Sequence, residues 1–423
     1  MWLHFDLLTA KRRGELIMAV DLKGIPGLAR RPKRPRLLLW SSLLLWFMLF
    51  SWPIEIFFTE YWGRQINLWT VLVVSFLIWL ILICVRLMAY AIQNRIADGW
   101  DEARAQDLSG RYHLGRRSLQ VLGVRMCTAL NSTGETSEQL ITALISGNGV
   151  IRTQPYRLDG AAVRHSRLES EDDADPETVL IKALAVVVRD LAQVLAKMPD
   201  DRVLNFLLEA DSKLEESTLR RIWQYVWRQS GIRHSLVAVS DSGLGALDQW
   251  LDQESGQEDM LLVIAFQFLP EQPTETAEVV TGLLLGGRKA PPYHAPIAFI
   301  HRPEFLQKGN GSASDSALQA LDWVPIDASS IEHVWRAGID KHLGSLVTMM
   351  LASAQLPVNV DRNMHDLDML LGCAGKAAPW LVIAIVVQSI QVGAGAQFVV
   401  SGDGFSSADL WGGVVTPVLP RSV

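Results

Sequence analysis

A four-residue stretch, SDSG at positions 240–243, is the part of the sequence best placed to do chemistry. It follows the apolar run 236–239 and precedes a segment whose leucines, at 244, 247 and 251, have helical spacing. A tight turn between a strand and a helix places its residues at the mouth of a sheet, where enzymes can hold a nucleophile. A serine hydroxyl at such a turn needs an adjacent base, because it is a weak nucleophile at neutral pH.

Three histidines are the candidates for that base. His294 and His301 each lie close to a proline in an interval rich in glycine and proline, where a lone histidine is usually structural. His342 lies further on, in the segment KHLGS at 341–345, and has no cysteine with which to pair. The three cysteines are far apart and show neither CxxC nor metal-ligand spacing. We therefore predict no disulfide framework, no metal site and no cofactor, as expected for a reducing compartment.

The elements that must position the turn alternate between strands and helices. Residues 261–268 and 279–285 are almost uninterrupted apolar runs, which are typical of strands buried on both faces. Upstream, residues 179–195 and 214–229 have helical periodicity and enclose a strand at 202–208. Trp223 and Trp227, spaced i and i+4, are predicted to pack in the core. This succession indicates an α/β sheet protein.

The serine turn resembles the nucleophile turn of the thiolase-fold ketosynthases, which reads roughly A-C-A-S-G before a helix. Further resemblances follow the family's order along the chain: VLGV at 121–124, TAL at 128–130, the segment 136–151, KHLGS as the "GH..GaaG" turn before a buried helix, and the final helix at 372–384. The resemblance implies a thiolase-like layered α/β domain over residues 117–423.

The departures from the family pattern fall on its catalytic residues. Alignment on Ser242-Gly243 puts Ser240 where the family has its cysteine. Neither His294 nor His301 reproduces the family's H-G-T-G-T loop, and His342 lacks the preceding glycine and one residue of the spacing. The resemblance therefore implies a degenerate site, with Ser240 and His342 in the old pocket, and a protein that is not an enzyme.

Two uncharged segments near the N-terminus predict a transmembrane hairpin over residues 37–91. One lies between Arg36 and Glu55, and the other runs from 65 to 85, each long enough to cross a bilayer. Residues 1–36 are rich in lysine and arginine, whereas the connecting loop is not, so the positive-inside rule places the basic segment and all that follows the hairpin in the cytoplasm. Residues 92–116 are predicted to be a helical stalk. A cleaved signal peptide is the less favoured alternative, and Met18 is an alternative start.

A third charge-free run, residues 377–402, could also be taken for a membrane span. Gln388, Gln391 and Gln397, together with Gly393 and Gly395, favour a buried helix followed by a turn and a strand. The acidic segment 169–176 is expected to be a solvated loop rather than a metal site. A net charge of −6 and a pI near 5.9 argue against nucleic acid as a partner.

The combination of a membrane hairpin with a degenerate thiolase-like domain resembles the type VI lipase adaptor family of bacterial type VI secretion. It implies an adaptor or chaperone at the bacterial inner membrane, with the main domain in the cytoplasm, that binds a lipase-class effector and aids its loading on the secretion spike. The expected partners are the effector, a spike component, the lipid bilayer and a second copy of the chain. The alternative is a diverged ketosynthase or acyl-transfer enzyme acting on membrane-associated acyl chains. A third interpretation is a structural membrane protein that dimerises through this fold.

Overall fold

The computed structural model describes residues 25–62, 67–131, 136–168, 175–200, 202–253, 259–287, 295–306, 312–359, 362–402 and 409–417. His294 and most of the predicted acidic loop lie outside these ranges. Residues 21–112 form one compact unit, and the chain from His113 onward belongs to a second. Each unit is described by itself.

The first unit is a helical hairpin formed by α1 (Leu37–Trp62) and α2 (Leu68–Gly115). Both helices are long and apolar enough to cross a membrane. The two helices are joined by a hydrogen bond between the hydroxyls of Ser51 and Ser75 (3.0 Å) and by one from the Trp79 indole to the Trp40 carbonyl (3.0 Å). The predicted stalk continues α2 without a break.

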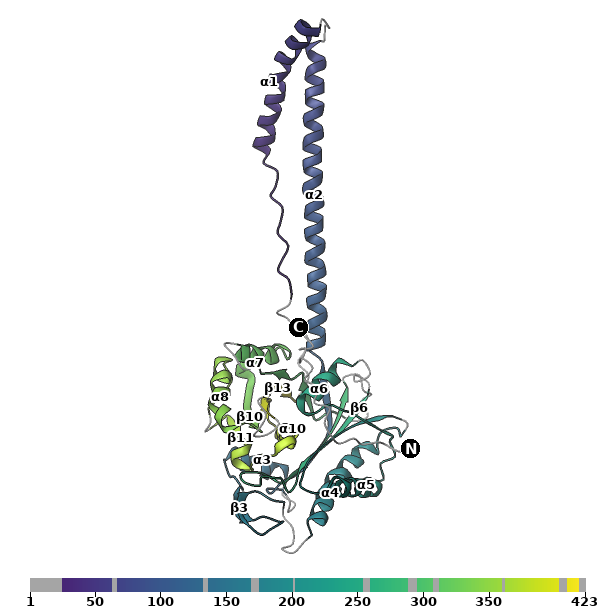
Figure 1. The fold of residues 1–423 in the computed structure, drawn as a ribbon, viewed down its shortest axis with the longest axis vertical. Helices are drawn as coiled ribbons and strands as arrows, with labels where there is room; N and C mark the ends of the chain where they lie inside the picture. Colours follow the sequence, from purple (N-terminus) through teal and green to yellow (C-terminus); the bar gives the residue numbers. More distant parts are fainter. Residues whose placement is uncertain are drawn as a thin grey trace. The chain divides into compact units, whose positions relative to one another are not determined.

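An extended segment, residues 25–36, runs along α2 and is called the strap (Figure 1). The Arg31 guanidinium pairs with Asp98 and with Asp101, and the Ala29 amide also donates to Asp101 (2.9 Å). The strap's backbone carbonyls accept hydrogen bonds from α2 as well, from the Trp100 indole (3.3 Å) and the Arg104 guanidinium (2.8 Å). The strap therefore covers one face of α2.

The second unit is built on a mixed sheet that consists of two halves. From one edge the order is β11-β10-β12-β13-β8-β1-β7-β6-β4-β5, with β9 (Glu304–Phe305) pairing to the side of β13. The strands of the first half are β1 (Ser118–Cys127), β4 (Leu204–Asp211), β5 (Leu236–Ala238), β6 (Met260–Gln267) and β7 (Val279–Gly287). Those of the second are β8 (Ala298–His301), β10 (Ile331–Ala337), β11 (Met364–Asp366), β12 (Ala396–Ser401) and β13 (Trp411–Thr416).

The two halves of the sheet are a structural duplication. Numbered by chain order within its own half, each half has the strand order 3-2-4-5-1, and the parallel and antiparallel pairings match. The halves meet where β1 pairs antiparallel with β8. The predicted α/β class and layered architecture are confirmed.

Helices cover both faces of this sheet (Figure 1). In the first half α4 (Pro176–Leu195) and α5 (Glu216–Ser230) pack on the outer face, and α7 (Ser312–Asp322) and α8 (Gly344–Ser353) are their counterparts in the second. Between the halves lie α6 (Gly243–Asp252) and α10 (Ala378–Gln391), and α3 (Ser137–Ile145) packs against α10.

Alternation along β6 shows why its sequence is apolar throughout. Leu261, Val263 and Ala265 face the core around α6 and α10, whereas Leu262 and Ile264 face the core around α4 and α5. A strand with helices on both sides needs apolar side chains on both faces. Trp223 of α5 belongs to the outer core, where its ring stacks on Phe206 at 4.8 Å between centroids.

The predicted elements from 179 to 285 and the buried helix within 377–402 are all present. Two features were not predicted. A small hairpin of β2 (Arg152–Pro155) and β3 (Ala162–His165) follows helix α3, which ends at Ile145, and the interval rich in glycine and proline contains strand β8. Strands β2, β3 and β8 have only four residues each, too few for a periodic pattern.

Replacement of Gly282 by alanine is expected to destabilise the domain. A Cβ atom there would lie 2.4 Å from Val187 Cγ1 and 2.8 Å from Leu191 Cδ1, so β7 and α4 would have to separate. Overpacking of this kind costs about 1–3 kcal/mol. Gly413→Ala in β13 is the matched control, because its Cβ would meet no atom closer than 3.5 Å. Denaturant unfolding of the two variants in detergent should separate them, and equal stabilities would contradict this account of the packing.

Candidate functional site

The serine turn lies where the sequence predicted it, between β5 and the start of α6. Ser240 is exposed, and Ser242 occupies the position before the helix without capping it through its side chain. Gly243 begins the helix with φ +58°, a conformation that favours glycine. The turn therefore presents a serine hydroxyl at the entrance to a helix that is buried between the two halves of the domain.

A buried carboxylate occupies the first backbone donor of this helix. Glu209 of β4 is 7% exposed, and its Oε1 accepts a hydrogen bond from the Gly243 amide at 2.6 Å. A negative charge at a helix N-terminus satisfies a free N–H group and interacts favourably with the helix dipole. The same charge opposes an oxyanion, which would need such donors for its own stabilisation.

The two predicted histidines that the structure describes, His301 and His342, belong to other elements than the serine turn. His342 is exposed in a 3₁₀ turn after β10, where its backbone amide donates to Asp340. His301 is buried in β8, with Nε2 3.0 Å from the Thr416 hydroxyl. Among the contacts of the described residues, none joins Ser240 to His342. The expectation that the site is degenerate stays a prediction.

The match of KHLGS to the "GH..GaaG" turn is wrong, because the helix that follows it, α8, has one exposed face. The fully buried helix is α10, and the turn before it reads DMLLGCAG at 368–375, which has the family spacing. Met369, 60% exposed, then stands at the histidine position. Gly372 in this turn has φ +98°, and a Cβ there would lie 2.5 Å from the Thr276 carbonyl oxygen.

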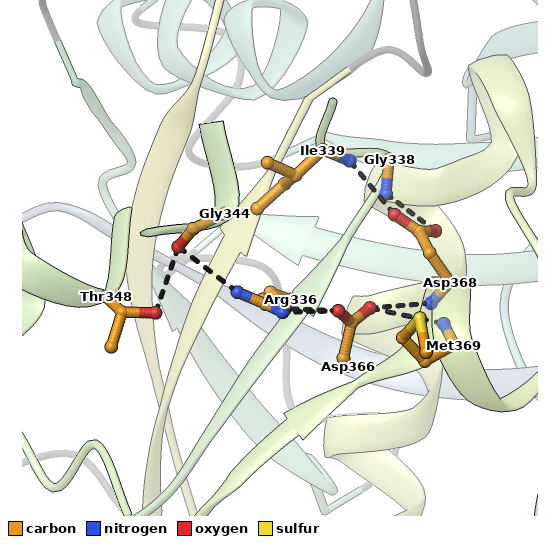
Figure 2. A network of polar contacts seen from close by, with 8 residues as sticks. All are labelled: Arg336, Gly338, Ile339, Gly344, Thr348, Asp366, Asp368 and Met369. Carbon is orange, nitrogen blue, oxygen red and sulfur yellow. Dashed lines mark hydrogen bonds and ion pairs between the residues drawn. The ribbon is translucent and has the colours of Figure 1, made fainter. Parts of the chain in front are cut away.

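Three charged residues form a network beside this turn (Figure 2). The Arg336 guanidinium at the end of β10 donates to Asp366 Oδ2 through Nε (2.8 Å) and Nη2 (2.5 Å). Asp366 also accepts from the amides of Asp368 and Met369, and so caps the short helix α9 (Leu367–Leu370). Arg336 Nη1 reaches the Gly344 carbonyl at 3.4 Å. The network links β10, β11, α9 and the start of α8.

Asp368 closes the network on its other side. Its two oxygens each accept a backbone N–H at 3.0 Å, from Gly338 and Ile339, which directly follow β10 (Figure 2). Burial raises the pKa of Asp368 to about 6, and the two hydrogen bonds oppose that rise. These carboxylates therefore hold loops in place through backbone contacts.

A cavity of about 660 Å³ opens against this network. Its walls combine aliphatic side chains, mixed charges and the exposed Met369, and neither the serine turn nor His342 lines it. Within the described part of the chain, no group of three or more histidine, cysteine, aspartate or glutamate side chains could hold a metal ion. The lining residues include Leu144, Ile145, Glu275, Arg336, Asp340, Lys341, Asp366, Asp368 and Met369.

No family model matches the sequence. No curated protein matches it either. Solved structures similar in fold include the ishigamide ketosynthase/chain length factor (12% identity, TM-score 0.47, covering 71% of this chain and 99% of that one). Others are the priming β-ketosynthase of the R1128 polyketide pathway (15%, 0.42, 72% and 98%) and 3-oxoacyl-[acyl-carrier-protein] synthase III of Aquifex aeolicus VF5 (10%, 0.39, 71% and 100%).

The fold of the second unit is thiolase-like, and it follows a pair of helices able to span a membrane. The duplicated strand order supports this assignment of the fold. The likeness to solved structures concerns the fold and says nothing about activity. Sequence reasoning missed Glu209, Arg336, Asp366 and Asp368. A signal for the last two was present, because D-x-D at 366–368 ends on the first residue of the stretch that has the spacing of the glycine turn.

Asp368→Asn is expected to remove a pH dependence of stability. The pKa of Asp368 is raised from 3.8 to about 6 in the folded protein, so ionisation of this carboxyl group disfavours folding. The stability of the wild-type protein therefore falls as pH rises through that range. Because one pKa unit corresponds to about 1.4 kcal/mol, the variant should gain up to about 3 kcal/mol relative to wild type between pH 4 and 7. Unfolding free energies measured across this range in detergent test it, and parallel pH curves would contradict it.

Proposed function

We propose that this protein is a membrane-anchored, non-catalytic adaptor that binds another protein through its thiolase-like domain. The observation that carries the proposal is the hydrogen bond from the Gly243 amide to Glu209 at the start of α6. A ketosynthase-type reaction develops negative charge at this turn and needs donors there. Here a buried carboxylate already takes the first donor of the helix.

The neighbouring groups support the same proposal. Ser240 is exposed and has no base within hydrogen-bonding reach among the described residues, so its hydroxyl lacks the activation that a serine nucleophile needs. Met369 replaces a histidine, and a thioether cannot transfer a proton. Asp366 and Asp368 accept several hydrogen bonds each and stabilise loops. Their hydrogen bonds stabilise the loops beside the cavity.

The rim of the 660 Å³ cavity is the surface that we assign to the partner. Met369 is 60% exposed there, beside the exposed Lys341 and the carboxylate of Asp340. An exposed methionine adapts its shape to an apolar contact, and charges at the rim give specificity. A protein partner fits this combination of a hollow, an apolar anchor and a charged rim.

The partner is proposed to be a lipase-class effector of type VI secretion, which the adaptor helps to load on the secretion spike. Support comes from the pairing of a degenerate thiolase-like domain with a two-helix anchor. The bacterial inner membrane is the proposed location, with the domain in the cytoplasm, because Arg30, Lys33, Arg34 and Arg36 stand at the end of the hairpin that continues into the domain.

Ser240→Ala is expected to leave partner binding intact, whereas Lys341→Glu should weaken it about tenfold, since reversing a rim charge replaces an attraction to the partner by a repulsion. Arg233→Glu is the matched control, because Arg233 is exposed in the other half of the domain. Affinity purification from the native host with quantitative mass spectrometry measures all three. Loss of the partner in Ser240→Ala, or acylation of purified protein at Ser240 by an acyl thioester, would favour the enzyme instead.

The proposed topology predicts the behaviour of C-terminal reporters. Alkaline phosphatase fused after Val423 should be inactive, and a fluorescent protein at the same place should be bright, because the chain after α2 stays on the basic side of the bilayer. Fusions in the connecting loop near residue 64 should show the opposite pattern. Active phosphatase at the C-terminus would overturn the cytoplasmic placement.

A further inference from the structure

The part of α2 that follows Arg86 has an apolar face that no other described segment covers. Arg86 lies beside the strap, with Nη2 3.5 Å from the Lys33 carbonyl, and so marks the basic end of the hairpin. Ile92 and Ile96 lie about 9 and 15 Å further along the helix axis, at 1.5 Å per residue. Gln93, Asn94 and Arg95 between them belong to a polar, aqueous setting. These isoleucines are nonetheless 52% and 67% exposed.

The strap does not account for this face, because it covers a different one. Ala97 is only 5% exposed, and Asp101 and Arg104, which lie on its side of the helix, bond the strap. The isoleucines lie on the side of α2 that the strap leaves open. Exposed aliphatic side chains in succession along a helix in water are costly unless another surface covers them.

The exposed positions Ile92, Ile96, Gly99 and Ala103, together with the half-buried Ala89, repeat with the spacing of a coiled coil. Ala89, Ile92, Ile96, Gly99 and Ala103 are separated by three, four, three and four residues, a period of 3.5. We call these five residues the seam. Gly99 has no atom within 4 Å of where its Cβ would lie, so a second helix can approach it closely.

We propose that the seam pairs with the same seam of a second copy of this chain, in a parallel two-stranded coiled coil. The membrane selects this partner, because copies anchored in one bilayer present their seams at the same height and in the same direction. Arg95 and Trp100 flank the seam with the five-residue offset at which side chains face each other across a parallel pair. The half-exposed Trp100 ring can then receive the guanidinium of Arg95 from the other copy. The inference rests on the membrane anchoring in the proposed function and not on the partner.

Two alanines on neighbouring positions give a matched test. Ala103 belongs to the seam, whereas Ala105, also exposed, lies about 200° further around the helix. Each is replaced by cysteine in full-length protein carrying Cys84→Ser, because Cys84 is exposed whereas the other two cysteines are buried. Oxidation in native membranes should give about tenfold more disulfide-linked dimer for Ala103→Cys than for Ala105→Cys, since only the seam positions face each other.

A third variant tests the apolar contact itself. Adding Ile96→Asp to Ala103→Cys should abolish the cross-link, because it places two carboxylates opposite each other in the seam. Equal cross-linking at 103 and 105, or none at 103, would overturn the inference. Carbonate extraction of the same membranes tests the anchoring on which the inference rests. If carbonate released the protein, both the membrane anchoring and the proposed dimer would be contradicted. Partner binding by the domain would then be measured separately.

Discussion

The burial of α10 between the two halves of the sheet is the constraint on which the domain depends. Every residue from Ala378 to Ile390 is buried, and the helix packs against β1 and β7 of one half and β10, β12 and β13 of the other. Neither half has a complete core alone, because both use the same helix to cover an inner face. The charge-free sequence of Ala378–Ile390 follows from this position, since a charged side chain there would meet no water.

Several turns end at the edge of this shared core, and their backbone groups account for the buried polar residues around the candidate site. Chain turns that end between two packed halves leave backbone groups which must be paired. Gln267 donates to the carbonyls of Ala277 and Cys373, Asp368 accepts the amides after β10, and Glu209 accepts the first amide of α6. These buried polar side chains therefore pair with the backbone of the turns that enclose the shared core.

Sequence patterns predicted the parts of the fold in which one segment determines its own environment. The apolar runs of β6 and β7 and the periodicity of α4 and α5 are of this kind. The network of Arg336 with Asp366 could not be predicted, because the two residues are 30 positions apart and meet only through the pairing of β10 with β11. The short motif at 341–345 misled for a related reason: a glycine turn after a basic residue is common, and only burial of the following helix distinguishes DMLLGCAG.

The exposure of Ser240 and Met369 separates these two side chains from the packing of the core. The core packing of α6 and α10 comes from apolar residues on their buried faces, whereas Ser240 and Met369 are exposed. Substitutions at the exposed positions therefore leave the scaffold's stability almost unchanged, while Gly372 and the buried acceptors remain necessary. The cavity beside the network is therefore held by Arg336, Asp366 and Asp368 and not by the exposed side chains at its rim.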